Sequence, residues 1–327
     1  MNNNLPWTEK YRPDKLSDII DEGNKVAIIK GLIDKDEIPN MLFYGPPGTG
    51  KTSLILACVK EYYGNNYRKY VKELNASDDR GIDTVRNTIP EFVKTSTNKI
   101  KIVILDEADA LTNDAQGALR RTIEQYCMYC RFCLICNNIY KIIIGLRSRC
   151  VTIRFGKLPY SNLIDKLNKI IEIENVRIDD KAKEYLSLEC GDFRQTLNML
   201  QLIHTLKINL QGPEYQPIVE NDICDYLSIP TKSIFNEIIK NLTTKTIRFN
   251  SEMLLHHHNS NMYTIVELVK MLVHWVAHHP KLATNQKKTL IKELAELDNR
   301  LKNSMGESDM QLYQLATIFT ELKIDKT

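Results

Sequence analysis

The chain has 327 residues, of which 43% are hydrophobic and 26% are charged, and its formal net charge is +3. This is the composition of an ordinary soluble protein with room for two or three domains. No apolar run approaches the roughly 18–20 residues of a membrane span, and the start of the chain lacks an apolar signal core, so we expect neither a membrane protein nor a secreted one. The mildly basic balance permits a nucleic-acid partner without requiring one, and eight cysteines in a non-secreted chain favour free thiols over disulfides.

The region from residue 40 to residue 156 alternates between short apolar runs and helical patterns. The apolar runs are nearly unbroken, which is typical of parallel strands covered by helices on both faces. The pattern predicts strands at 40–44, 70–77, 99–109, 131–136 and 150–156, and helices at 53–63, 81–96 and 114–126. We therefore expect an α/β domain built on a parallel sheet.

The character of the chain changes after Leu158, because strand patterns stop and helical periodicity takes over. Helices are predicted at 159–176 and 179–206, a loop at 211–217, and further helices from about 232 to the end. The chain is thereby predicted to have three parts: a nucleotide-binding domain at 1–157, a small helical lid domain at 158–228 and an all-α C-terminal domain at 229–327.

A glycine-rich motif lies between the first predicted strand and the first predicted helix. Its sequence, GPPGTGKT, fits G-x-x-x-x-G-K-[ST], in which glycines let backbone N–H groups curl around phosphate oxygens. Lys51 would reach the β- and γ-phosphates, and the Thr52 hydroxyl would ligate Mg²⁺. Because the motif has the strand and helix it needs, we predict a P-loop made of Gly45, Pro46, Pro47, Gly48, Thr49, Gly50, Lys51 and Thr52.

Acidic residues end the strand predicted at 99–109. Asp106 is placed to supply a carboxylate to Mg²⁺, and Glu107 is placed to polarise the attacking water. Acids after a strand also cap helices, and that interpretation stays open for Asp109. An Asp–Glu pair favours hydrolysis over binding alone, because one acid would be enough to hold the metal. Asn137, which ends the next strand, can orient the water, although asparagine ends many strands for turn reasons.

Arginines outside the predicted sheet are candidates for contacting the γ-phosphate. Arg147 and Arg149 can be solvated charges or a finger that reaches a neighbour's nucleotide. Arg194, in the second predicted part, can reach back to the chain's own nucleotide. The residues alone leave both interpretations open.

A run of cysteines raises the question of a metal site, because C-x-x-C repeats occur in zinc and iron–sulfur proteins. Cys133 and Cys136 lie on a predicted buried strand, where an odd separation sends side chains to opposite faces, so they cannot share a metal. Cys127 and Cys130 fall in the predicted link before that strand. We therefore expect packing roles for the cysteines of the strand rather than metal binding.

Eight short motifs occur in order in the first two thirds of the chain. They are LPWTEKYRP at 5–13, GPPGTGKT at 45–52, ELNASDDRGID at 73–83, ILDEAD at 104–109, ALRR at 118–121, RFCLICN at 131–137, SRC at 148–150 and GDFRQTLN at 191–198. As a set they resemble the small subunits of replication factor C, the eukaryotic clamp loader of the AAA+ class. NASDDRGID, RFCLICN and LAELDNRL further resemble the subunit type numbered 3 in yeast and 5 in humans. The resemblance implies an α/β AAA+ P-loop domain followed by a helical lid domain and an all-α collar.

The resemblance also implies roles for matching residues. It makes Glu107 the catalytic base, with Asp106 holding the metal. Asn137 would be the sensor-1 residue and Arg194 the sensor-2 arginine. Arg149 would be the finger that acts on the next subunit's ATP.

The N-terminal motif is assigned to the nucleotide in the same way. The resemblance implies that this motif lines the base and ribose side of the nucleotide, where tyrosine and arginine offer stacking and hydrogen-bond donors. The alternative is a segment that merely packs on the domain. The implied cofactors are ATP and Mg²⁺, and the residues concerned in the N-terminal motif are Tyr11, Arg12 and Pro13.

The implied function is ATP-driven loading of the sliding clamp PCNA onto primer–template DNA, in a nuclear heteropentamer with other replication factor C subunits and with no membrane partner. Arg80, Arg86 and Lys94 are candidates for DNA contacts, because backbone binding needs only positive charge near helix ends. The alternative for each is a solvated surface charge.

Two other functions share much of this sequence pattern. A homohexameric DNA helicase or branch-migration motor would also have the P-loop, the acidic strand and the finger. An ATP-binding scaffold subunit without turnover is the second alternative. The intact Glu107 argues against a dead site, but a finger supplied by a neighbour leaves turnover undecided by the sequence.

Overall fold

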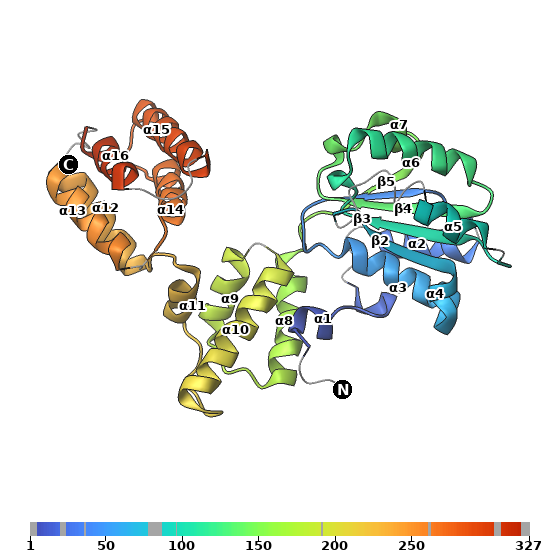
Figure 1. Ribbon diagram of the computed structural model, residues 1–327. Coiled ribbons are helices and arrows are strands. Elements are labelled where there is room, and N and C mark those ends of the chain that lie inside the picture. The colour runs from blue at the N-terminus through green and yellow to red at the C-terminus, as the bar shows by residue number, and fades with distance from the viewer. Residues whose placement is uncertain are drawn as a thin grey trace. The chain divides into compact units, whose positions relative to one another are not determined.

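The computed structural model describes residues 5–19, 24–35, 37–77, 87–95, 97–190, 192–260, 263–303 and 309–321 (Figure 1). By their contacts the residues form two compact units, one of Met1–Val176 with Glu184–Leu202 and one of Arg177–Lys183 with Ile203–Thr327. The predicted division into three parts at residues 157 and 228 stays a prediction. Among the helices in these ranges, none is both long enough and apolar enough to span a bilayer.

The first unit is built on a five-stranded sheet with the order β2-β3-β4-β1-β5. Every pairing is parallel, with β1 beside β4 and β5 and with β3 beside β2 and β4. The prediction of an α/β fold on a parallel sheet is confirmed. The strands are β1 (Met41–Tyr44), β2 (Val71–Asn75), β3 (Lys101–Asp106), β4 (Cys130–Cys136) and β5 (Val151–Arg154).

Helices cover both faces of this sheet because successive strand residues point to opposite sides. Met41 and Phe43 join a buried cluster against α2 and α3, whereas Leu42 joins a second cluster against α5, α6 and α7. Figure 1 shows α6 and α7 above the sheet and α3 and α4 below it. These helices are α2 (Lys25–Asp34), α3 (Lys51–Tyr63), α4 (Tyr67–Tyr70), α5 (Ile89–Lys94), α6 (Asn113–Gln125) and α7 (Ile144–Arg147), with short 3₁₀ turns at Leu16–Asp18, Gly64–Asn66, Ala108–Ala110 and Ile139–Lys141.

The cysteine run follows the same alternation along β4. Cys133 packs in one buried cluster and Cys136 in the other, which confirms that the two side chains lie on opposite faces of the sheet. Cys130 is the first residue of β4 and is fully buried, so its predicted place in the link was wrong; Gln125 ends α6, and only Cys127 of the four lies in the link. Burial raises the pKa of Cys130 and of Cys136 to about 12, which keeps both thiols protonated. Within the described ranges, no group of three or more His, Cys, Asp or Glu side chains is placed to hold a metal ion.

These environments predict unequal thiol reactivity. We expect iodoacetamide at pH 8 to modify exposed Cys127 at least about 100-fold faster than Cys130, Cys133 or Cys136, because each buried thiol must await local unfolding. Mass spectrometry of the peptides after timed alkylation of the folded protein measures the four rates. In denaturant all four should react alike; similar rates in the folded protein would contradict the buried strand.

The remainder of the first unit is a short N-terminal helix, α1 (Trp7–Lys10), packed with the helices that follow the sheet. The backbone N–H of Trp7 donates to Gln201 Oε1 at 2.9 Å, and Lys10 Nζ lies 2.6 Å from Glu174 Oε1. The Tyr11 hydroxyl donates to the same carboxylate. These contacts attach the N-terminal motif to two of the helices that follow the sheet, α8 and α10. The three helices of this region are α8 (Tyr160–Glu174), α9 (Asp180–Glu189) and α10 (Phe193–Gln211).

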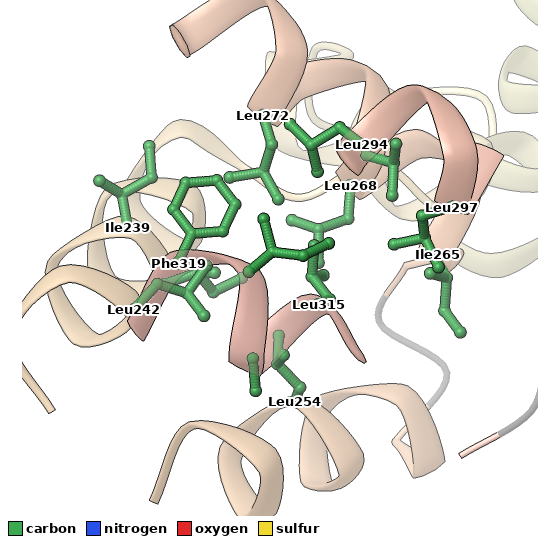
Figure 2. Packing of buried hydrophobic residues seen from close by; sticks show 14 of the residues in the cluster. Ile239, Leu242, Leu254, Ile265, Leu268, Leu272, Leu294, Leu297, Leu315 and Phe319 are labelled. Carbon is green, nitrogen blue, oxygen red and sulfur yellow. The ribbon is translucent and has the colours of Figure 1, made fainter. Parts of the chain in front are cut away.

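The C-terminal helices of the second unit enclose a core of their own (Figure 2), which includes Leu254, Leu268, Leu294 and Phe319. Three of these helices begin at a threonine whose hydroxyl accepts a hydrogen bond from the first turn, at Thr231, Thr246 and Thr264, as N-caps commonly do. The helical prediction after residue 232 is confirmed for the part of this region that the structure describes. The helices of the second unit are α11 (Glu220–Leu227), α12 (Lys232–Thr244), α13 (Ile247–Asn259), α14 (Ile265–His278), α15 (Thr284–Asn303) and α16 (Asp309–Glu321), together with the first residues of α9 and the C-terminal part of α10.

Candidate nucleotide-binding site

The predicted P-loop connects the carboxyl end of β1 to the first turn of α3. Gly48 and Gly50 have φ angles of +71° and +85°, a region that favours glycine, and Gly50 is the N-cap residue immediately before α3. A Cβ at Gly48 would lie 2.7 Å from Cβ of Asp192, so the loop also needs glycine there to approach the start of α10. The loop thus ends at the N-terminus of α3, and a glycine-rich loop at a helix N-terminus is the arrangement that binds phosphate.

Lys51 extends from the first residue of α3 back across this loop. Its ammonium donates to the carbonyls of Gly45 and Pro46 at 2.8 and 2.7 Å, and to Asn137 Oδ1 at 2.9 Å. The side chain is 93% shielded from solvent, and burial lowers the pKa of Lys51, an effect that the nearby Asp106 carboxylate opposes. The structure therefore brings Lys51 and Asn137, 86 positions apart in the sequence, into direct contact.

The two acids at the end of β3 lie beside the next P-loop residue. Thr52 Oγ1 donates to Asp106 Oδ2 at 2.7 Å, and the backbone N–H of Glu107 donates to Asp106 Oδ1 at 2.8 Å. Glu107 has a φ of +52°, a left-handed conformation that costs a non-glycine residue roughly 1–2 kcal/mol. This sharp turn exposes the Glu107 carboxylate while Asp106 stays oriented toward Thr52.

Asp109, the last acid of the DEAD string, makes a different kind of contact. Its Oδ2 accepts from the backbone N–H of Asn138 at 3.1 Å. It thus links the 3₁₀ turn after β3 to the turn after β4, on which Asn137 lies. This contact gives Asp109 a local structural role next to the site.

A cavity extends from the P-loop to the N-terminal segment and to α8 and α10, all within the first unit. Of the predicted residues, Asp106, Glu107 and Asn137 line it, as does most of the P-loop. The N-terminal motif and the lid helix contribute the remaining predicted members, Tyr11, Arg12, Pro13 and Arg194. One cavity therefore gathers predicted residues as far apart in the sequence as Tyr11 and Arg194.

Comparison with known proteins places these motifs in a family. Residues 41–157 match the family described as ATPase family associated with various cellular activities (AAA). Replication factor C subunit 5 of Arabidopsis thaliana is 37% identical over 325 residues, which cover 97% of this chain and 87% of that protein. The chain belongs to the replication factor C subunits.

Relatives of the numbered type predicted from the motifs are identical at a higher percentage of positions, over shorter stretches. The probable replication factor C subunit 5 of Dictyostelium discoideum is 50% identical over 211 residues, or 63% of this chain and 61% of that one. Replication factor C subunit 3 of Schizosaccharomyces pombe is 49% identical over 204 residues, or 61% of this chain and 60% of that one. In these matches the chain spans about three-fifths of the length of its curated relatives. The predicted resemblance to the type numbered 3 in yeast and 5 in humans is confirmed.

The fold is shared more widely than the sequence. The solved structure of the Thermotoga maritima RuvB Holliday junction branch migration motor matches with a TM-score of 0.54 over 75% of this chain and 85% of that one. Only 16% of the residues are identical, so this likeness concerns the fold alone.

Other predicted residues of this replication factor C chain lie away from the cavity or outside the described ranges. Arg149 NH1 donates to the carbonyl of Gly145 at 2.8 Å, and its NH2 pairs with Glu124. Arg80 and Arg86 lie outside the described residues. Lys94 is exposed at the last residue of α5.

Three polar side chains near the replication factor C motifs were missed by sequence reasoning. Lys166 of α8 lines the cavity, with Nζ 5.2 Å from the ring centroid of Phe193. Lys101 is 1% exposed, and its ammonium donates to the carbonyls of Phe92, at 2.6 Å, and Val93, at 3.3 Å, near the end of α5. A lysine on an apolar strand was a signal, but its partner could not be read from the sequence.

Gln116 is the third of these side chains and is 1% exposed inside α6. Its Nε2 donates to the carbonyls of Leu111 and Lys141 at 3.2 and 3.0 Å, and its Oε1 accepts from the N–H of Ile143 at 2.8 Å. The amide therefore ties α6 to the segment that leads from Asn137 to α7. Its position on the buried face of an amphipathic helix was the available signal.

Proposed function

We propose that this chain is an ATP-binding and ATP-hydrolysing subunit of a clamp loader, which opens the sliding clamp PCNA and loads it onto primer–template DNA in replication and repair in the nucleus. The observation that best supports the proposal is a pair of hydrogen bonds at the P-loop. Lys51 donates to Asn137, and Thr52 donates to Asp106, which lies next to Glu107. Binding of nucleotide follows from the AAA family match; hydrolysis and its use in clamp loading are the proposal.

The residues fit MgATP by the chemistry of their donors. Hydroxyl and carboxylate oxygens are the ligands that Mg²⁺ takes from proteins, and Thr52 and Asp106 present these groups 2.7 Å apart. The bound ion would neutralise charge on the β- and γ-phosphates, while Lys51 and the loop N–H groups hold the phosphate oxygens. Glu107 would accept a proton from the attacking water, and Asn137 would orient that water.

Arginines complete the site in this proposal. Arg194 would contact the γ-phosphate from α10 as the sensor of the chain's own nucleotide, and its place in the cavity lining supports this. Arg149 would act on the ATP of the next subunit, which agrees with its place outside that lining. Tyr11, Arg12 and Pro13 would contact the base and ribose.

The assembly belongs to the same proposal. The chain would join four other replication factor C subunits in a heteropentamer, with the C-terminal helices forming the collar. Arg80, Arg86 and Lys94 would contact DNA phosphates. ATP binding would close neighbouring subunits on the clamp and DNA, and hydrolysis would release them.

The homohexameric motor is supported by fold alone, because the branch-migration motor shares 16% of residues whereas a replication factor C subunit shares 37% over almost the whole chain. The scaffold without turnover would not need the Glu107 carboxylate exposed on a strained turn, because Thr52 and Asp106 are enough to hold the metal. The clamp-loader subunit is therefore the better supported function.

The subunit composition of the native complex tests the proposal. We expect purification under non-denaturing conditions and native mass spectrometry to find four different related subunits at one copy each, with PCNA in substoichiometric amount. Six copies of this chain alone would refute the clamp loader in favour of a homohexameric motor. A tagged, unrelated nuclear ATPase purified in parallel controls for adventitious capture.

A further inference from the structure

We infer that Glu124 is a positioning residue, which holds the guanidinium of Arg149 so that its remaining donors face the nucleotide site of a neighbouring subunit. The inference rests on the proposed function, in which Arg149 acts in trans. The carboxylate of Glu124, on α6, would set the orientation of Arg149, which follows α7.

Two anchors fix the Arg149 side chain. The carbonyl of Gly145, in the first turn of α7, accepts from NH1 at 2.8 Å, and the carboxylate of Glu124, near the end of α6, pairs with NH2. An arginine has five N–H donors in one plane, so anchoring both terminal nitrogens sets the plane and leaves other donors unused. The side chains of Arg149 and Glu124 are 36% and 44% exposed, so the pair lies at the surface, where a neighbour can reach it.

The anchors themselves belong to a rigid frame. Leu119 and Ile123 bury the inner face of α6, and Leu146 buries that of α7. The Gln116 amide joins the two elements, because it accepts from the N–H of Ile143 and donates to the carbonyl of Lys141. Arg149 is held by two elements that are themselves hydrogen-bonded to each other, so its guanidinium keeps its orientation when a phosphate approaches. A group that stabilises a transition state must be oriented in this way before the reaction begins.

A third residue defines the place of the carboxylate. Arg120, one turn before Glu124 on α6, has Nε 3.8 Å from the same Glu124 oxygen, and its Cδ lies 3.0 Å from where a Cβ on Gly145 would be. Glu124 thus lies between two guanidinium groups. Exposed ion pairs contribute little to folding stability, so this arrangement is better explained by orientation than by stability.

The same contact has an opposite interpretation, in which Glu124 holds Arg149 back from the neighbour. If Arg149 must leave Glu124 before it can act, the carboxylate inhibits hydrolysis at the neighbour's site. If Glu124 orients Arg149, the carboxylate promotes that hydrolysis. The unused donors of the guanidinium favour orientation, because Arg149 can bond a phosphate while it keeps both anchors.

The test is ATP hydrolysis at the neighbour's site in the assembled complex, measured as single turnovers with Glu124→Ala, Glu124→Gln and Arg149→Ala in this chain. We expect Arg149→Ala to slow the step by about 100-fold or more and Glu124→Ala by about tenfold, with the neighbour's ATP affinity unchanged. Glu124→Gln should recover most of the rate, because its amide oxygen still accepts from NH2. Glu252→Ala, which removes an exposed i,i+4 ion pair with Arg248 in the second unit, is the matched control and should leave the rate unchanged.

Double substitution separates positioning from other effects. In the Arg149→Ala background, Glu124→Ala should add nothing; a further loss would show that Glu124 acts elsewhere and overturn the inference. Faster hydrolysis with Glu124→Ala would identify inhibition instead, and an unchanged rate would identify a solvated pair. Normal hydrolysis in a complex that carries Arg149→Ala would overturn the inference. ATP binding at Lys51 would be intact in that complex, so failure of the inference can be distinguished from failure of the proposed function.

Discussion

Replacing Lys51 with alanine is expected to raise the dissociation constant of the isolated chain for ATP by at least about 100-fold. A desolvated cation that pairs with a buried anion contributes about 3 kcal/mol or more, and each 1.4 kcal/mol is about tenfold in affinity. Lys51 is buried, and its three hydrogen bonds hold its ammonium against the loop and Asn137. Isothermal titration calorimetry with MgATP measures the change.

The control for this experiment lies on the same helix. Lys60 of α3 pairs with Asp14 at 2.7 Å and is 36% exposed, so Lys60→Ala removes an ammonium without touching the P-loop. We expect Lys60→Ala to bind ATP as the unchanged chain does, and both variants to keep its circular dichroism spectrum. Unchanged affinity in a folded Lys51→Ala variant would refute the P-loop assignment.

The P-loop region was predictable because each of its features is local. GPPGTGKT lies within eight residues, and the turn it forms depends on glycines at fixed offsets. The sheet followed from unbroken apolar runs, which are read without knowledge of the partner strands. The carboxyl ends of β3 and β4 meet at one edge of the sheet, and Asp106 and Asn137 therefore line the same cavity.

The contacts that were missed connect residues far apart in sequence. Nothing in the run 99–109 shows that Lys101 caps α5, because the carbonyls it reaches are presented only after the chain has folded. The partner of Arg149 could not be predicted for the same reason, since Glu124 is on another helix and exposed acids are common. Cys130 was misplaced because β4 begins earlier than its apolar run: Lys101 donates its N–H to the carbonyl of Tyr129, which extends the ladder.

Replacing Glu107 with glutamine is expected to leave ATP bound and to slow its hydrolysis at this site by about 10²–10⁴-fold, the range attributed to a general base. Glutamine has the same shape and the same backbone preferences, so the left-handed turn at +52° carries no additional strain. The hydrogen bond from the backbone N–H of residue 107 to the Asp106 carboxylate, which orients the metal ligand, is also retained. Loss of rate with unchanged ATP affinity would therefore report on the carboxylate alone.

The measurement is a rapid-quench single turnover of labelled ATP in the assembled complex, with the partner subunits' P-loop lysines changed to alanine so that only this site binds. Asp109→Asn is the matched control, because its amide oxygen can still accept from the N–H of Asn138 while the charge is removed. We expect Asp109→Asn to hydrolyse within about threefold of the unchanged complex, since a hydrogen bond between neutral groups replaces one to a charged group away from the reacting water. If Glu107→Gln and Asp109→Asn slow hydrolysis equally, the DEAD acids act through the local field rather than through one base. If neither slows it, the chain binds ATP without using Glu107, and the scaffold function replaces the enzymatic one.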